Sequence, residues 1–221
     1  MLFASPRKKA LKILKNQSVD PKDRHGIELK PLLDRFRKKT PAGKKVFNPN
    51  HLGLDLINDT PTDTERVELD QRYQECTCHF DADFYLVLTY TPVYLTPLKP
   101  VGICLAGFNL ERRKRLCIVQ IQGLRCDNFN EFLYKQGEFL EFLEILHSIR
   151  WEKLLVAALE QWAKKMGFKK IGIQKAKHND YFNHDNLNTP KNWRLKMHYD
   201  VTAQRMGYKA TKRSKYFFKN L

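Results

Sequence analysis

The chain has little of several features that define specialised classes of protein. Its five cysteines are odd in number and irregularly spaced, which excludes a disulfide-stapled miniprotein and predicts a reducing, cytoplasmic location. Ten glycines and ten prolines exclude a collagen-like repeat, and 42% hydrophobic residues exclude a disordered tail. The longest apolar stretches, such as Val101–Phe108, are far below the roughly 20 residues that span a bilayer. Met1–Ala4 runs directly into basic residues, so we expect neither a secretion signal nor a membrane span.

Acidic residues are also scarce, and the imbalance is uneven along the 221 residues. There are 24 Asp and Glu against 40 Lys and Arg, a formal net charge of +16. Residues 1–45 carry fourteen basic and four acidic residues, and residues 164–221 carry fifteen and three. The middle, residues 46–163, carries eleven and seventeen, a net −6. Two basic ends of this size attract polyanions, above all nucleic acid, or an anionic membrane face, and a solubilising surface is the equal alternative.

The first 63 residues are predicted to form a basic N-terminal arm and linker. Leu11, Ile13 and Leu14 among lysines predict one short basic helix, and Leu29, Leu32, Leu33 and Phe36 predict a second. Residues 48–63, rich in Asn and Asp and with two prolines, predict an irregular linker. A compact domain is therefore expected over residues 64–221.

Within that domain the pattern predicts strands first and helices later. Phe84–Tyr90, Pro100–Phe108 and Leu116–Gln122 are expected to form an antiparallel meander, with a polar turn over residues 109–115. Apolar residues from Phe132 to Leu146 indicate helical structure. Then come a helix from Trp151 to Met166 capped by Gly167, a strand over residues 170–174, a loop over 177–192, a helix over 197–206 and a strand over 216–218. The order predicts an α+β or mixed α/β fold, with a mixed sheet flanked by helices.

From about residue 80 to 221 this order resembles the GNAT superfamily of acyl-CoA N-acyltransferases. The resemblance rests on the strand pair PVGICLAGF and LCIVQIQG, the helix WEKLLVAALEQWAKKMGF feeding KKIGIQ, and a second helix that closes in Arg205-Met206-Gly207-Tyr208. In that family the strands that match Leu116–Gln122 and Lys170–Gln174 splay apart, and acyl-CoA lies in the gap. Amides at the start of the helix that matches 151–166 hold the pyrophosphate, as a helix N-terminus can.

The resemblance implies acetyl-CoA or another acyl-CoA as cofactor. The residues it implies for cofactor binding are Val119, Ile121, Gln122, Ser148, Ile149, Arg150, Trp151, Glu152, Lys153 and Asn179. Ile149 and Trp151 stand where the phosphate loop of the family has glycines, so that loop is degenerate here. The family's frequent general-acid tyrosine falls at Ala203, and Tyr199, one turn earlier on the same helix face, is the catalytic residue that we expect in its place.

Three other groups have both a structural and a functional interpretation. Cys76-Thr77-Cys78-His79 is the densest thiol and imidazole group, but zinc sites usually need two such pairs, so no metal is expected. The stretch from His178 to Asp185 favours a loop of turn formers over a metal site or a general base. The segment 212–218 interleaves cations with aromatics, which suits either nucleic-acid stacking or a half-buried strand.

Two functions therefore stand side by side, and the sequence leaves open whether the protein is an enzyme. The first is a GNAT-like N-acyltransferase that moves an acyl group from acyl-CoA to an amine, with a nucleic-acid-associated substrate as one variant. The alternative is a non-catalytic module of the same fold that binds nucleic acid through its basic termini, with a larger complex as a further setting. The nucleic-acid-binding residues expected are Arg7, Lys8, Lys9, Lys12, Lys38, Lys39, Lys212, Arg213 and Lys215.

Overall fold

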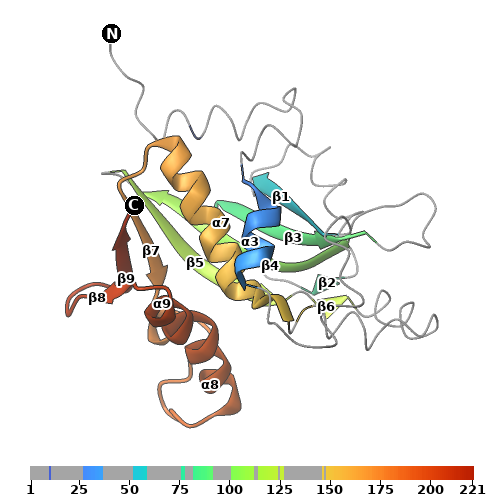
Figure 1. The fold of residues 1–221 in the computed structure, drawn as a ribbon. Coiled ribbons are helices and arrows are strands. Elements are labelled where there is room, and N and C mark those ends of the chain that lie inside the picture. Colours follow the sequence, from blue (N-terminus) through green and yellow to red (C-terminus); the bar gives the residue numbers. More distant parts are fainter. Residues whose placement is uncertain are drawn as a thin grey trace.

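The computed structural model contains a seven-stranded mixed sheet with helices packed against it (Figure 1). It describes residues 10, 27–36, 52–58, 76–77, 82–91, 101–111, 114–123, 125–126, 146 and 148–221. The strand order in the sheet is β1-β3-β4-β5-β7-β9-β8. These strands are β1 (Leu52–Asn58), β3 (Phe84–Tyr90), β4 (Val101–Glu111), β5 (Arg115–Gly123), β7 (Lys170–Gln174), β8 (Lys209–Ala210) and β9 (Tyr216–Asn220).

The predicted antiparallel meander is confirmed as β3, β4 and β5. All seven residues of β3 are buried, so both faces of the sheet are covered at this strand. Its β-branched and aromatic residues suit a strand that packs on both sides. The turn between β4 and β5 is shorter than predicted, because β4 runs to Glu111 and β5 begins at Arg115.

Helix α7 (Trp151–Met166) is the predicted long helix, and it lies across one face of the sheet (Figure 1). Leu154–Leu159, Trp162, Ala163 and Met166 are buried, which matches the predicted apolar face. Gly167 ends the helix with φ 86°, and its N–H bonds carbonyls of the last turn, as predicted for a glycine cap. The helix therefore delivers the chain directly into β7.

Two elements of the first 63 residues belong to the sheet and its core. The irregular linker predicted over 48–63 is wrong for Leu52–Asn58, which form β1 and pair antiparallel with β3. The second predicted basic helix exists as α3 (Leu29–Phe36), but it packs against α7 and buries Leu32, Leu33 and Phe36. The Asn, Asp and Gly residues of this stretch predicted a loop. The stretch is a strand because the backbone edge of β3 provides its hydrogen-bonding partners. The first predicted helix, apart from Ala10, lies outside the described residues.

The C-terminal part has more helix and less loop than predicted. After β7 comes a short 3₁₀ turn, η3 (Ala176–His178), and α8 (Pro190–Lys196) begins before the predicted start. The chain continues through a π-helix, η4 (Met197–Val201), into α9 (Thr202–Arg205), and Gly207 stops it with φ 81°, as predicted. The last strand is confirmed as β9, while β8 was not predicted.

The fold is therefore α+β with a mixed sheet. The larger apolar cluster lies between the sheet and α7 with α3, and a smaller one contains Tyr85, Leu105, Cys117 and Val119. A separate two-stranded ribbon joins β2 (Cys76–Thr77) and β6 (Arg125–Cys126). No helix in the described part of the chain is long and apolar enough to cross a membrane. The predicted helical residues 132–145 lie outside the described residues.

Candidate functional site where β5 and β7 separate

Strands β5 and β7 form the parallel pair of the sheet, and they stay paired over only part of β5. The register runs from Arg115 opposite Lys170 to Ile118 opposite Ile173. Strand β5 continues to Gly123, whereas β7 ends at Gln174. The two strands therefore separate beyond Ile118, and the second half of β5 presents backbone groups that β7 does not reach.

The hydroxyl of Tyr199 lies at this separation. It accepts hydrogen bonds from the backbone N–H of Ile121 at 3.1 Å and from Asn179 Nδ2 at 3.2 Å. The hydroxyl also donates to the carbonyl oxygen of Val119 at 3.3 Å. Tyr199 is 2% exposed, so this hydrogen-bond network is almost inaccessible to solvent. Four of the residues predicted from the sequence thus meet around one oxygen atom.

The π-helix η4 sets the position of Tyr199. A π-turn adds one residue to a helical turn and commonly marks a functional site. Here it turns Tyr199 towards β5, while Ala203, at the position of the family's acid, is fully buried in the core. The neighbouring Asp200 accepts a hydrogen bond from Ala176 N–H at 2.8 Å, which ties η4 to the turn after β7.

Asn179 is held by its own backbone and side chain. Its N–H bonds the carbonyl of Ala176, and its Oδ1 accepts from Tyr181 N–H at 3.0 Å. Gln174, at the end of β7, donates to the carbonyl of His178 at 2.7 Å. The amide nitrogen of Asn179 is thereby aimed at Tyr199.

The start of α7 has an unusual backbone. Arg150 adopts a left-handed conformation with φ 47° and ψ 57°, and its carbonyl accepts from the N–H groups of Lys153 and Leu154. Glycine adopts this conformation most readily, yet here it falls on Arg150, between the two residues aligned with glycines, Ile149 and Trp151. Ile149 is fully buried and its side chain belongs to the core. Trp151 is partly buried and packs on His198 with ring centroids 5.4 Å apart.

Charges gather at this helix start. Burial and then the charges of Arg150 and Arg205 lower the pKa of the Lys153 amine, which indicates three cations close together. Glu152 lies in the same turn, and its carboxylate is 3.1 Å from His198 Nδ1. His198 precedes Tyr199, so the Glu152–His198 contact joins the helix start to the tyrosine. Sequence reasoning missed both His198 and Arg205, because their partners lie on another helix.

The remaining predicted cofactor residues lie near these two groups. Val119 packs its side chain in the smaller apolar cluster and offers its carbonyl, while Ile121 packs in the larger cluster. Gln122 is half-buried and accepts from Gln120 Nε2 at 2.9 Å, and Ser148 is half-buried just before Arg150. Val119 and Ile121 thus contribute backbone groups rather than side chains to the network.

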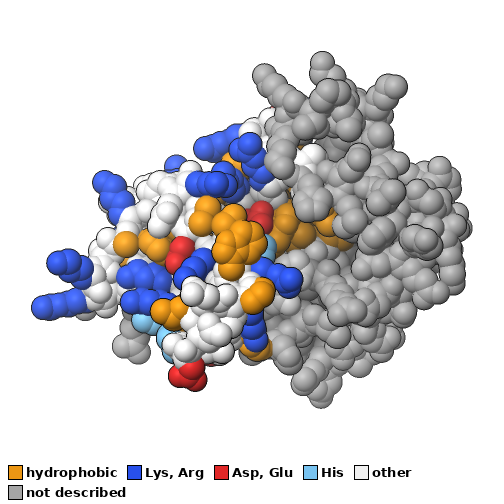
Figure 2. All heavy atoms as spheres, turned by 90° about the horizontal axis from the view of Figure 1, so that it is seen from below, with side chains coloured by type: hydrophobic (Ala, Val, Ile, Leu, Met, Phe, Trp, Pro, Cys, Tyr) orange, Lys and Arg blue, Asp and Glu red, His pale blue; other side chains and the backbone are white. Residues whose placement is uncertain are grey.

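The basic residues of the C-terminal end are exposed, and the aromatics beside them are not. Lys212, Arg213 and Lys215 lie between β8 and β9 on the surface. Tyr216 and Phe217 are buried in β9, so the interpretation as a half-buried strand applies to residues 216–218, whereas residues 212–215 lie outside the strand. Figure 2 shows Lys and Arg side chains spread over this part of the molecule, around a group of hydrophobic side chains. The N-terminal candidates Arg7, Lys8, Lys9, Lys12, Lys38 and Lys39 lie outside the described residues.

The two groups considered as metal ligands in the sequence form no metal site among the described residues. Among the described residues, no three His, Cys, Asp or Glu side chains are grouped to hold an ion. The backbone of Cys76 pairs with that of Cys126 in the β2–β6 ribbon, while Cys78 and His79 lie outside the described part. In the stretch 183–188, asparagine side chains accept hydrogen bonds from nearby N–H groups, as turn formers do.

Comparison with models of protein families finds no match to this chain, and a search of curated proteins finds no relative. The fold and the geometry therefore carry the functional argument.

Proposed function

We propose that the protein is a GNAT-like N-acyltransferase that binds acyl-CoA where β5 and β7 separate and directs an amine to its thioester. The observation that supports this most is the Tyr199 hydroxyl, held by Ile121 N–H and Asn179 Nδ2 at that separation. In the family that the sequence resembles, acyl-CoA lies between the two matching strands, and a tyrosine protonates the departing thiolate.

Tyr199 has the hydrogen bonds of a proton donor. Its donation to the Val119 carbonyl is 3.3 Å long, beyond the usual 2.7–2.8 Å for an O–H donor, so this hydrogen bond is weak. The two N–H groups that point at the oxygen would stabilise the negative charge left after proton transfer. Such a group needs to serve only as an acid, because acyl transfer to an oriented amine requires little other machinery.

The start of α7 would receive the phosphates of the cofactor. Arg150, Lys153 and Arg205 place three cations there, at the positive end of the helix dipole. The Glu152 carboxylate would repel a phosphate, but a protonated His198 in contact with it would offset part of its negative charge.

Titration calorimetry with acetyl-CoA tests this proposal. We expect binding that weakens several-fold in Lys153→Gln, because one phosphate contact is lost. Tyr199→Phe should lower kcat with little change in KM. Tyr208→Phe is the matched control, because it removes another nearly buried hydroxyl, bonded to Glu160 at 2.9 Å, away from the strand separation. No heat of binding at millimolar acetyl-CoA would contradict the proposal.

A second candidate function is a non-catalytic module that binds nucleic acid. The observation that favours it is the pair of large side chains, Ile149 and Trp151, at the family's glycine positions. Exposed Lys212, Arg213 and Lys215 would contact phosphates. The affinity should then fall steeply with salt, and replacing the three cations with glutamine should reduce the salt dependence. Because α3 contributes to the core, such substitutions are a cleaner test than deletion of the N-terminal end.

A further inference from the structure

The largest exposed hydrophobic side chains of the described part lie in one short excursion between β7 and η4. They are Tyr181, Leu187 and Trp193, with exposed fractions of 40%, 56% and 64%. The other two tryptophans of the chain differ, since Trp162 is fully buried and Trp151 is half-buried. An indole as exposed as Trp193 is unusual, because tryptophan is highly buried on average.

Hydrogen bonds hold the excursion, residues 175–196, in a fixed conformation in which Trp193 faces outward. Thr189 caps α8 by accepting from Asn192 N–H at 3.1 Å. The buried Asn192 side chain donates to the carbonyls of Asn183 at 2.7 Å and Asn186 at 3.0 Å, and accepts from Asn183 N–H at 2.8 Å. These bonds fix the loop to α8. With Asn192 and Leu195 facing inward, helical geometry turns Trp193 to the outer face.

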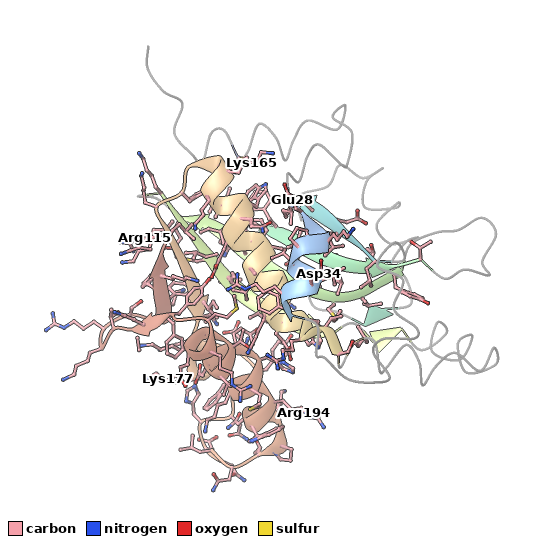
Figure 3. The ribbon with its side chains drawn as sticks, in the orientation of Figure 1. Glu28, Asp34, Arg115, Lys165, Lys177 and Arg194 are labelled. Atoms are coloured by element: carbon pink, nitrogen blue, oxygen red, sulfur yellow. The ribbon has the colours of Figure 1, made fainter. Side chains whose placement is uncertain are left out.

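Cations surround the exposed aromatics. Lys191 Nζ lies 4.9 Å from the centre of the Tyr181 ring, and Lys196 Nζ lies 5.9 Å from that of Phe182. Lys196 and Trp193 are three residues apart on α8 and are therefore neighbours on its surface. Arg194, also exposed on α8, lies on the helical part that projects below the sheet (Figure 3).

The charge of the excursion indicates the chemistry of its partner. Residues 175–196 contain five Lys and Arg and two Asp, a net +3. The larger segment 164–221 carries +12, and one of its three acids, Asp200, is half-buried and bonded to Ala176 N–H. Three exposed apolar side chains are too few for a membrane anchor or for the apolar centre of a protein interface. Exposed aromatic rings in a segment of net positive charge suit unpaired bases linked by phosphates.

We propose that this aromatic and basic surface, formed by Tyr181, Lys191, Trp193, Arg194 and Lys196, binds single-stranded nucleic acid. Trp193 stacks on an unpaired base, Tyr181 offers a second ring whose one face is covered by Lys191, and the cations contact the backbone phosphates. The inference rests on the second candidate function, for which it names the kind of nucleic acid, and it does not depend on acyl-CoA binding.

Binding of the full chain to fluorescein-labelled oligothymidylate, oligouridylate and a DNA duplex tests the inference. Stacking on one aromatic ring contributes about 1–3 kcal/mol per base, so Trp193→Ala should weaken single-strand binding about tenfold. Trp193→Phe should keep most of the affinity, and duplex binding should change little. Leu187→Ala is the matched control, because it removes an exposed apolar side chain of the same excursion that has no ring. Since Trp193 is exposed, Trp193→Ala should unfold at the wild-type temperature.

The salt dependence separates this inference from the function on which it rests. Trp193→Ala should lower the single-strand affinity at every salt concentration without changing the slope, because a stacking contact releases no counterions. The triple glutamine variant at 212, 213 and 215 should instead reduce the slope for single strand and duplex alike. If wild type binds both and Trp193→Ala binds the single strand as wild type does, the stacking surface is refuted and nucleic-acid binding stands. If wild type binds neither, both fail. If the wild type binds anionic vesicles but no oligonucleotide, and Trp193→Ala weakens the vesicle binding, the inference is overturned in favour of a lipid partner.

Discussion

Removing the hydroxyl of Tyr199 is the sharpest test of the site. Tyr199→Phe keeps the ring, which is 2% exposed, and deletes the oxygen atom that joins β5 to the turn after β7. The variant leaves Ile121 N–H and Asn179 Nδ2 without this acceptor, and the carbonyl of Val119 without this donor. The change is therefore a loss of hydrogen bonds at constant packing.

The loss of stability depends on which of these three groups can form a hydrogen bond with water in the variant. A buried donor or acceptor left unsatisfied costs about 1–3 kcal/mol. The N–H of Ile121 belongs to a strand and cannot turn away, so it takes the full penalty. The Asn179 side chain is 8% exposed and can rotate, and the Val119 carbonyl loses only a long bond. We expect Tyr199→Phe to lower the free energy of unfolding by about 2–3 kcal/mol.

Urea denaturation and hydrogen exchange together measure this effect. Tyr208→Phe, the control, should lose less, since Lys219 still donates to Glu160 at 2.9 and 3.0 Å. Amide exchange should accelerate in the second half of β5 in Tyr199→Phe and not in the control. If Tyr199→Phe is as stable as wild type and the exchange of β5 is unchanged, the proposed network does not hold the strand, and its role as an aimed acid fails with it.

Three further outcomes follow from buried groups elsewhere in the structure. The indole N–H of Trp162 is buried without a hydrogen-bond partner, so Trp162→Phe should cost less than about 1.5 kcal/mol, whereas Trp162→Ala should cost about 3–5 kcal/mol; urea denaturation of both compares them. Burial raises the pKa of the Asp200 carboxyl above 3.8, so its contribution to stability is present at lower pH and is lost as pH rises through the folded value. Asp200→Asn should therefore gain stability over wild type on going from pH 3.8 to neutral pH, and equal pH profiles would contradict this. Burial raises the pKa of both the Cys104 and Cys117 thiols, so iodoacetamide should label these two residues only after unfolding. Mass spectrometry of peptides locates the label, and rapid labelling of either residue in the native protein would contradict their burial.

Much of the fold could be predicted because its strongest elements carry local signals. Strand β3 is a run of β-branched and aromatic residues, α7 has a full apolar face, and Gly167 and Gly207 both adopt the left-handed conformation expected of helix-ending glycines. The weak β1 could not be predicted, because its place depends on the edge that β3 offers rather than on its own residues.

The candidate site was predictable in part, because the order of elements resembles that of a known family. Tyr199 and Asn179 were identified from the sequence, but twenty residues separate them, and their contact needs the chain to return across the end of β7. The π-helix that aims Tyr199 depends on how η4 packs, since no local pattern distinguishes it from an ordinary turn. Arg150 was expected among the cofactor-binding residues of a degenerate loop, and only the backbone revealed its left-handed conformation.

The sequence by itself determined the basic ends, the meander, the long helix and the residues that could carry chemistry. The ends and the secondary structure depend on composition and on neighbours a few positions away, whereas the candidate site residues came from the order of elements that resembles a known family. Tertiary structure decided which of those residues act together. It buried Tyr216 and Phe217 and exposed Trp193, although all three are aromatic, because the exposure of a side chain depends on what the rest of the chain places against it.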